Sequence, residues 1–402
     1  MTEAPAEAAA LEREMRAWRR QLHRNPEFGC EETESARCVT ERLRGFGSEE
    51  IETGVGGTGV VATLRRGEGA RVIALRADMD CLRIEERTNL PHASTRPGLM
   101  HACGHDGHVA TLLGAAAMLA RDGGCDGAVR FVVQPAEEWG QGMSAMIRDG
   151  LGRRAWIGEG RGSRRGFDEI YGLLNKPGRA GGALETRAGP FMAAEDGFAI
   201  SVRGAGGHAS APQACRDAIV CACAIVGELQ TIVSRRVDPA ELAVVSVTSI
   251  HADNVRNAIA EEARIEGDCR HFDPAVSETI EAAMGEIARG LALAHGCEAE
   301  LSYERVFVPL VNAAAATAHA LEAARAVFGE AAVSGEAARM GGAEDFAQAL
   351  RLAPGAFVNI GNGDSAVCHS PHFNYADDAL MPGARWFAEL VRRRLPVAGA
   401  GR

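Results

Sequence analysis

Two short apolar runs, each followed at once by carboxylates, constrain the fold of this chain most. VIAL lies within Arg71–Arg76 and leads into ADMD, and AVRFVVQ at Ala128–Gln134 leads into PAEEWGQG. Runs of this length and composition predict buried strands. Between them, Val109–Ala120 (VATLLGAAAMLA) is typical of a helix. Strands that alternate with helices predict a mostly parallel sheet, and open α/β sheets bind ligands where their strands end.

The pattern changes near Gly189, and a second domain is predicted from there. Strands are expected at Phe198–Val202, Leu242–Ile250, Ala263–Cys269 and Ala299–Val306, and helices at Asp217–Val233 and Ser277–His295. This β-α-β-β-α-β order is typical of a ferredoxin-like α+β unit with its helices on one face. The chain has 402 residues, more than the roughly 250–300 at which single cores stop growing. We therefore expect an α/β domain at 1–189 and 307–402, with an inserted domain at 190–306.

Charge and composition exclude several partners. The net charge of -11 argues against nucleic acid, because phosphate binding needs a basic surface. No run approaches the ~18 apolar residues of a membrane span. The first residues, MTEAPAEAAALEREM, lack the apolar core of a signal peptide. The 11 cysteines show no disulfide-like spacing, so we expect reduced thiols, a cytoplasmic location and no membrane partner.

The segment Met100–His108, MHACGHDGH, is the densest cluster of reactive side chains. Cys103 and His105 are both good ligands for zinc-like ions. Their i, i+2 spacing does not share a helix face, so a loop must point both inward, and Gly104 and Gly107 allow a tight backbone. Taken alone, the segment fits a metal site, a cysteine nucleophile or a polar loop.

Two acidic pairs follow the predicted strands. Asp78 and Asp80 could bind a cation, hold ligand imidazoles by hydrogen bonds, or form a solvated strand end. Glu137 and Glu138 are adjacent carboxylates, which repel each other unless a cation is near. One could bind metal while the other moves a proton, although such pairs are also common on surface loops.

Histidines in two further motifs are candidates. His208 lies in GAGGHASAP, where it is either a ligand-facing residue or an ordinary turn histidine. In VCHSPHFNY, either His369 or His372 could be a ligand, and Cys368 is not expected to face the same way as His369 in an extended segment. Together, four residues supply the nitrogen, sulfur and oxygen donors that suit zinc, manganese, cobalt or nickel: Cys103, His105, Glu138 and His369.

These motifs, in this order, resemble the M20 metallopeptidase family, and specifically its amidohydrolase branch. That branch contains hippurate hydrolases, N-acyl-amino-acid amidohydrolases and auxin-conjugate hydrolases. The resemblance covers nearly the whole chain and is carried by LHRNPEFGCEET, LRADMD, MHACGHDGH, QPAEEWGQG, GAGGHASAP, LQTIVSRRVDP, GAEDFA and CHSPHFNY. It implies a catalytic α/β domain with two divalent ions, and an inserted lid domain that often mediates dimerisation.

The resemblance also implies roles for the candidate residues. Cys103 would bridge the ions, with His105, Glu138 and His369 as further ligands. Glu137 would act on a metal-bound water as general base and then as general acid, while Asp80 would orient a ligand. The ions would be Mn²⁺ or Zn²⁺, with Co²⁺ or Ni²⁺ as alternatives, and the substrate an N-acetyl, N-benzoyl or aryl-acyl amino acid.

Three residues of the inserted domain would serve the substrate by the same resemblance. His208 would stabilise the oxyanion, in its own site or in that of the partner subunit. Asn254 and Arg270 would contact the substrate carboxylate. The expected assembly is a homodimer through the lid.

The sequence departs from the family pattern at a residue that matters for metal binding. The family has a histidine ligand in the motif G-L-H-N-x-P-G, but Ile170–Gly178 reads IYGLLNKPG, with Leu174 in the histidine position. Further departures are NVRNAIAEEA at 254–263 and Arg83 in place of a proline. We therefore hypothesise a weakened metal site, a changed metal preference or reduced activity. An impaired or non-catalytic homologue that binds such ligands, and a hydrolytic deaminase on the same scaffold, are the alternatives.

Overall fold

The computed structural model describes residues 5–122, 124–152, 166–252 and 256–397. Contacts between Cα atoms divide the chain into two compact units. The first unit contains Met1–Phe191, Val311–Ala338 and Asp345–Arg402, and the second contains Met192–Leu310 and Arg339–Glu344. The assignment of a catalytic and a lid domain to them stays a prediction.

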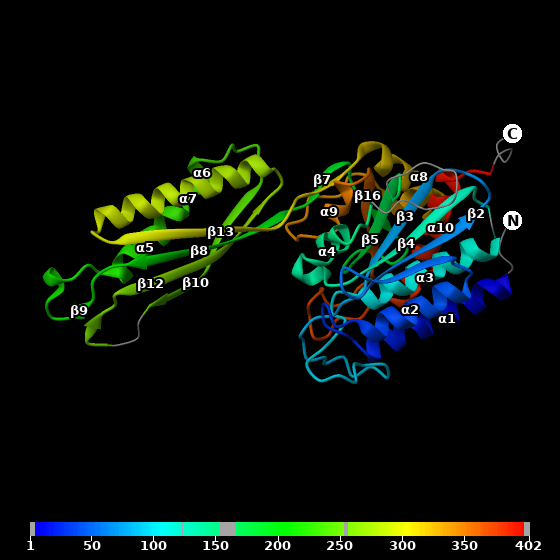
Figure 1. The fold of residues 1–402 in the computed structure, drawn as a ribbon, viewed down its shortest axis with the longest axis horizontal. Helices are drawn as coiled ribbons and strands as arrows, with labels where there is room; N and C mark the ends of the chain where they lie inside the picture. The colour runs from blue at the N-terminus through cyan, green and yellow to red at the C-terminus, as the bar shows by residue number, and fades with distance from the viewer. Residues whose placement is uncertain (1–4, 123, 153–165, 253–255, 398–402) are drawn as a thin grey trace. The chain divides into compact units, whose positions relative to one another are not determined.

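An eight-stranded sheet forms the centre of the first unit (Figure 1). Its strand order is β1-β2-β4-β3-β5-β16-β6-β15. The strands are β1 (Glu50–Val55), β2 (Gly59–Arg66), β3 (Val72–Asp78), β4 (Gly127–Gln134), β5 (Glu169–Lys176), β6 (Leu184–Glu185), β15 (Val333–Ser334) and β16 (Gly355–Gly361). The two apolar runs of the sequence are β3 and β4, and these strands lie side by side and parallel.

The sheet is mixed, so the prediction of a mostly parallel sheet holds only in part: the central pairs and the edge pair β6–β15 are parallel, and the other pairs are antiparallel. β3 pairs in parallel with β4 and β5, and β16 pairs in parallel with β5. The pairs β1–β2, β2–β4 and β6–β16 are antiparallel. A short connection such as that between β1 and β2 can join only antiparallel strands. A fully buried apolar strand, however, has the same sequence pattern whether the neighbouring strand is parallel or antiparallel to it.

Helices cover this sheet and complete its core. They are α1 (Pro5–Arg24), α2 (Thr33–Gly45), α3 (His105–Asp122), α4 (Gly142–Arg148), α8 (Ala314–Phe328), α9 (Ala347–Leu350) and α10 (Leu380–Arg394). Three short 3-10 turns are η1 (Glu137–Trp139), η3 (Glu330–Ala332) and η4 (Asp377–Ala379). α3 is buried along almost its whole length and packs on α1, α10 and β3. The position of His105 at its first turn is therefore fixed by the core.

The second unit has its own sheet and core. Its four strands are antiparallel in the order β10-β12-β8-β13. They are β8 (Ala194–Arg203), β10 (Ala243–Ala252), β12 (Glu262–His271) and β13 (Glu298–Phe307), with helices α5 (Ala218–Leu229), α6 (Thr231–Arg235) and α7 (Pro274–Ala294). Along β8, Phe198, Ile200 and Val202 are buried in alternation, as expected for a strand with one face covered by helices. The order of these elements is the β-α-β-β-α-β order that the sequence predicts.

The remaining elements are short. β9 (Gly207–His208) pairs with β11 (Ala258–Ile259), and η2 is Pro212–Ala214. β7 (Gly189–Met192) and β14 (Leu310–Asn312) lie where the chain passes from one unit to the other. Within the described ranges, every helix is too short or too polar to span a bilayer.

Candidate metal centre

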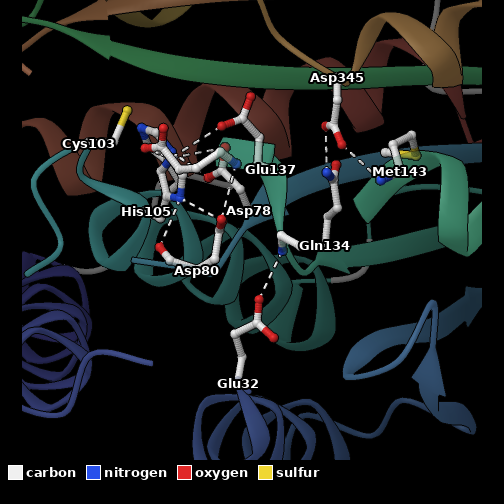
Figure 2. Close-up of polar contacts among 12 residues, drawn as sticks. Glu32, Asp78, Asp80, Cys103, His105, Gln134, Glu137, Met143 and Asp345 are labelled. Carbon is white, nitrogen blue, oxygen red and sulfur yellow. Dashed lines mark hydrogen bonds and ion pairs between the residues drawn. The ribbon is translucent and has the colours of Figure 1, made fainter. Parts of the chain in front are cut away.

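The predicted metal-binding residues of the first unit gather where β3 and β4 end and α3 begins. Glu137 and Glu138 form the start of η1, directly after β4, and His105 is the first residue of α3. Figure 2 shows Cys103, His105 and Glu137 close together, beside Asp78 and Asp80. We call one set of five residues the donor cluster: Cys103, His105, Glu137, Glu138 and His369.

The donor cluster consists of two overlapping triads. The ligand atoms of Cys103, Glu138 and His369 lie within 4.8 Å of one another, as do those of His105, Glu137 and Glu138. His369 Nε2 is 3.4 Å from Glu138 Oε1, and His105 Nε2 is 3.8 Å from the same oxygen. Two triads that share a carboxylate suit two neighbouring cations.

Asp80 orients two members of the cluster at once. Its Oδ1 is 3.0 Å from His105 Nδ1, and its Oδ2 accepts a hydrogen bond of 3.1 Å from the Glu138 backbone N–H. With the proton on Nδ1, the lone pair of His105 Nε2 faces the cluster. Carboxylates commonly hold ligand histidines in this way.

Two buried atoms of the cluster lack a hydrogen-bond partner. They are His105 Nε2 and Glu138 Oε1, on side chains that are 1% and 10% exposed. An unpaired buried polar atom costs roughly 1–3 kcal/mol, so a fold keeps one only for a reason. A divalent cation would bind both atoms, and the residues present therefore fit such an ion.

The charge balance of the cluster also fits a cation. Burial disfavours the charged imidazole of His105, but the carboxylates of Asp78, Asp80 and Glu138 outweigh burial and raise the pKa of His105 well above its ordinary value. A hydrogen bond with Cys368, burial and the charge of Glu138 raise the pKa of the Cys103 thiol. A bound divalent ion would reverse both effects, because it favours neutral imidazole and thiolate.

His108 lies beside the donor cluster and has a hydrogen-bond partner at each ring nitrogen. Its ligand atoms lie near those of Asp78 and His105. However, His108 Nδ1 is hydrogen-bonded to Asp78 Oδ1 at 2.6 Å, and its Nε2 accepts the backbone N–H of Asn175 at 3.1 Å. Both ring nitrogens are therefore occupied. The other oxygen of Asp78 accepts a hydrogen bond of 2.9 Å from buried Arg76.

The backbone takes a left-handed conformation at two residues of this region. Ala136, just before Glu137, has φ 47°, and His369 has φ 65°. Such values are uncommon for residues other than glycine and cluster at functional sites. The His369 N–H donates to the Ala102 carbonyl at 2.8 Å, which ties the C-terminal motif to the loop before α3.

The left-handed turn changes the premise of one expectation from the sequence. Cys368 and His369 were expected to face different ways because an extended segment was assumed, but the backbone turns at these two residues. His369 Nε2 lies 3.4 Å from Glu138 Oε1, so His369 reaches the donor cluster. The direction expected for Cys368 stays a prediction.

The glycines of MHACGHDGH leave room for neighbouring side chains. A Cβ at Gly107 would lie 2.3 Å from the Tyr375 ring. Gly104 has φ +90°, and a Cβ there would lie 2.5 Å from Asn175 Nδ2. The loop can approach both residues only without side chains at these positions.

Leu174, in the position of the expected histidine, contributes no donor atom. It is half-buried on β5, beside Asn175. The Asn175 side chain donates a hydrogen bond to the Cys103 carbonyl, and its Nδ2 lies 3.1 Å from His108 Nε2. Asn175 therefore supports the loop that carries Cys103.

Sequence reasoning missed two acids that hold the segment around Glu137. Glu32 Oε1 accepts the Ala136 N–H at 2.9 Å, and Asp345 accepts hydrogen bonds from Gln134 Nε2 and from the Met143 N–H (Figure 2). Both are buried. They lie in the motifs LHRNPEFGCEET and GAEDFA, which were recognised as motifs but given no role.

The other predicted site residues belong to the second unit, or lie outside the described residues. His208 is exposed on β9, with its Nδ1 2.8 Å from Ser210 Oγ. Arg270 on β12 forms ion pairs with Glu195 at 2.7 Å and with Asp268 at 2.8 Å. Asn254 lies outside the described residues. The roles of these three residues stay predictions.

Comparison with known proteins agrees with this chemistry. Residues 74–393 match the profile of peptidase family M20/M25/M40. The chain is 35% identical to a hippurate hydrolase of Campylobacter jejuni over 96% of this chain and 97% of the relative. It is also 35% identical to an N-acetylcysteine deacetylase of Bacillus subtilis, over 93% of this chain and 94% of the relative. The structure resembles that of a dinuclear metal binding peptidase of the M20 family from Bacillus subtilis, with a TM-score of 0.83, 32% identity, and 96% and 99% of the two chains covered.

Proposed function

This chain belongs to peptidase family M20/M25/M40 and is a hydrolase, and from that premise we propose that it cleaves the amide bond of N-acyl amino acids with two divalent ions. The observation that carries the proposal is the unpartnered Nε2 of buried His105, aimed into a cluster of carboxylates. The names of the two relatives support an acyl amino acid as substrate, since one is a hippurate hydrolase and the other an N-acetylcysteine deacetylase.

Four residues of the donor cluster would hold the ions. Cys103 would lie between them, and the remaining ligands would be His105, Glu138 and His369. Bound ions would polarise the scissile carbonyl and make a water molecule lose its proton more easily. Asp80 keeps His105 and Glu138 aligned for this task.

Glu137 would move the proton. Its side chain is 9% exposed, and its Oε2 lies 4.0 Å from His105 Nε2, so its carboxylate borders the ligands. In this role a Glu137 oxygen takes the proton from the attacking water. It then gives that proton to the nitrogen of the leaving amino acid, so that one residue serves as general base and general acid.

The second unit enters the proposal by resemblance. We propose that His208 stabilises the oxyanion, that Arg270 contacts the substrate carboxylate, and that residues 190–306 form a lid and mediate a homodimer. Arg270 is already paired with Glu195 through Nη2 and with Asp268 through Nε, so a substrate carboxylate would compete with these two acids for its guanidinium.

Leu174 favours a second candidate, an impaired homologue that binds N-acyl amino acids without turning them over. Leucine has no atom that can bind a cation, so one ion would lose a ligand. The presence of Glu137 at the donor cluster argues for catalysis.

A panel of N-acetyl, N-benzoyl and indoleacyl amino acids, assayed with and without a chelator, tests the proposal. We expect release of the free amino acid, loss of activity with chelator, and recovery when Mn²⁺ or Zn²⁺ is added. Binding of the panel without release would support the impaired homologue, and ammonia release from aromatic amines would support a deaminase. Turnover that resists chelator and is blocked by a thiol alkylator would overturn the metal mechanism in favour of Cys103 as nucleophile.

A further inference from the structure

The guanidinium of Arg270 is already held by oxygen atoms of its own unit. Its Nη2 lies 2.7 Å from Glu195 Oε2, and its Nε donates a hydrogen bond of 2.8 Å to Asp268 Oδ1. Its Nη1 lies 3.5 Å from the carbonyl oxygen of Gly341. All three nitrogens therefore have an oxygen partner from the second unit, so another carboxylate can bind there only in competition.

The register of the sheet places both acids beside Arg270. β12 and β8 are neighbouring strands (Figure 1), and in their antiparallel register Arg270 lies directly opposite Glu195. Side chains opposite each other in this way are within contact distance. Asp268 precedes Arg270 by two residues and therefore shares its face of the sheet. Cys269, between them, is buried in the core with the helices, so Arg270 and both acids lie on the opposite face.

Two carboxylates at one guanidinium leave this part of the sheet with an excess of negative charge. The side chains of Arg270, Glu195 and Asp268 are 25%, 29% and 31% exposed, so water screens their charges only in part. Burial raises the pKa of Glu195; the attraction of Arg270 opposes burial, and the charge of Asp268 adds to it. A carboxylate that approached Arg270 would be repelled by both acids, whereas a neutral group would not.

We infer that Glu195 is a specificity-determining residue: it occupies Arg270 and thereby removes most of the advantage that a free carboxylate would give a substrate. This role rests on the contact between Arg270 and the substrate carboxylate that the proposed function includes. It widens the substrate class to the carboxamides of N-acyl amino acids, in which a neutral amide replaces the carboxylate. Such a group is not repelled by Glu195 and Asp268, so both kinds of substrate should bind about equally well.

Steady-state kinetics with a matched pair of substrates test this role, on the full-length protein supplied with Mn²⁺ or Zn²⁺. N-benzoylglycine and N-benzoylglycinamide differ only in the carboxylate, and release of glycine or glycinamide measures cleavage of the benzoyl amide. The KM values of wild type for the two substrates should agree within about threefold. Glu195→Gln should lower KM for N-benzoylglycine by about three- to fivefold, the range that partly exposed ion pairs contribute. Its KM for N-benzoylglycinamide, and kcat for both substrates, should stay unchanged.

Two further variants define the result. Glu266→Gln is the matched control and should behave as wild type, because Glu266 lies on the same strand and face but pairs with Arg264 at 2.8 Å. Arg270→Gln in the Glu195→Gln background should abolish the gain in KM. An unchanged KM in Glu195→Gln, a gain that survives without Arg270, or a wild type that prefers N-benzoylglycine by about tenfold or more would overturn the role of Glu195.

A second variant and a binding measurement make the outcome independent of folding and of turnover. Asp268→Asn removes the other acid, so it should lower the same KM in the same direction even if Glu195→Gln folds poorly. Calorimetric titration with N-benzoylglycine should show tighter binding by both variants, again by about three- to fivefold. Tighter binding without release of glycine by any of the proteins would contradict the proposed function only. Release of glycine with the same KM and the same affinity in all of them would contradict the role of Glu195 only.

Discussion

Two buried polar clusters meet at the first turn of α3, and they differ in how closely their opposite charges pair. At the donor cluster, His105 Nε2 lies 3.6 Å from Asp78 Oδ2 and 3.8 Å from Glu138 Oε1 and is hydrogen-bonded to neither. We call the other set the paired cluster: Arg19, His23, Glu86 and Asp106. There, Asp106 Oδ2 is 3.2 Å from Arg19 Nη1 and 2.9 Å from His23 Nδ1, and His23 Nε2 is 3.3 Å from Glu86 Oε1.

His105 and Asp106 are neighbours in the sequence but belong to different clusters. Asp106 lies against opposite charges that the chain itself supplies, so its cluster stabilises the fold. His105 Nε2 faces carboxylates at 3.6 Å or more without a hydrogen bond, which suits the cation that we propose there. The closeness of the charge pairs, more than the residue types, distinguishes the paired cluster from the candidate binding cluster.

The largest effect is expected on kcat, from a change at Glu137, the proposed proton acceptor of the donor cluster. Glu137→Gln removes the proton acceptor, so kcat should fall by roughly 10²–10⁴. Metal content and the free energy of unfolding should stay near those of wild type, because the amide has the same shape. Steady-state kinetics and metal analysis measure both. Normal turnover by this variant would remove Glu137 from the mechanism.

Breaking the paired cluster should instead destabilise the fold. Asp106→Asn leaves the buried charges of Arg19 and His23 without their shared acid, which should cost about 3–5 kcal/mol of unfolding free energy. Urea unfolding of the metal-free protein measures it. Glu138→Gln is the contrasting variant, and it should cost less, because the nearest bases to Glu138 lie at 3.4 and 3.8 Å, whereas those of Asp106 lie at 2.9 and 3.2 Å. Equal losses in both variants would erase the distinction between the clusters.

The paired cluster should also make stability depend on pH. Burial opposes the charge on His23, but Asp106 and Glu86 outweigh burial and raise the pKa of His23 to about 9. A pKa raised on folding stabilises the protein below the unfolded value of about 6.5, and this contribution is lost as pH rises through about 9. The free energy of unfolding should therefore fall by up to about 3 kcal/mol over this range.

His23→Gln is the variant that tests this dependence. Its unfolding free energy should be lower than that of wild type at pH 6 and should change less between pH 6.5 and 9. Parallel curves for the two proteins would show that His23 is neutral in the fold.

The smallest effect is expected on metal affinity, from a change at Asp80, which aligns His105 and Glu138. Asp80→Ala removes the acceptor for His105 Nδ1 and for the Glu138 N–H, and should weaken metal binding by about 10–100-fold. Competition with a chromophoric chelator measures the affinity. Asp238→Ala, at an exposed turn of the second unit, should have wild-type affinity. An unchanged affinity for Asp80→Ala would mean that packing alone orients His105.

The sequence predicted those parts of the fold whose cause is local. Three apolar runs form β3, β4 and the interior of α3, namely VIAL, AVRFVVQ and VATLLGAAAMLA. Apolar runs bounded by polar residues form buried strands or helices, because few other structures bury all of their side chains. Strand direction was predicted less well. It depends on connections, such as the turn between β1 and β2, which burial patterns do not record.

The candidate site was predictable as a set of motifs but not as a geometry. Cys103, His105 and Glu138 follow predicted elements, so their proximity could be expected. The turn that brings His369 to Glu138 could not, because it depends on a left-handed residue that is a histidine and not a glycine. The roles of Glu32 and Asp345 are also hidden in the sequence, since both act through backbone N–H groups of a distant segment.

The hydrogen bond from the His369 N–H to the Ala102 carbonyl joins a late segment of the chain to an early one. The proposed metal site can therefore be completed only after the segment around His369 has been synthesised. His369 comes 231 residues after Glu138, so a chain still in synthesis holds Cys103, His105 and Glu138 without their last partner while those residues are made. The ion that we propose Glu138 and His369 share could be captured only after that. Free metal around the polypeptide at that moment, and competition among ions, would then decide which ion it carries.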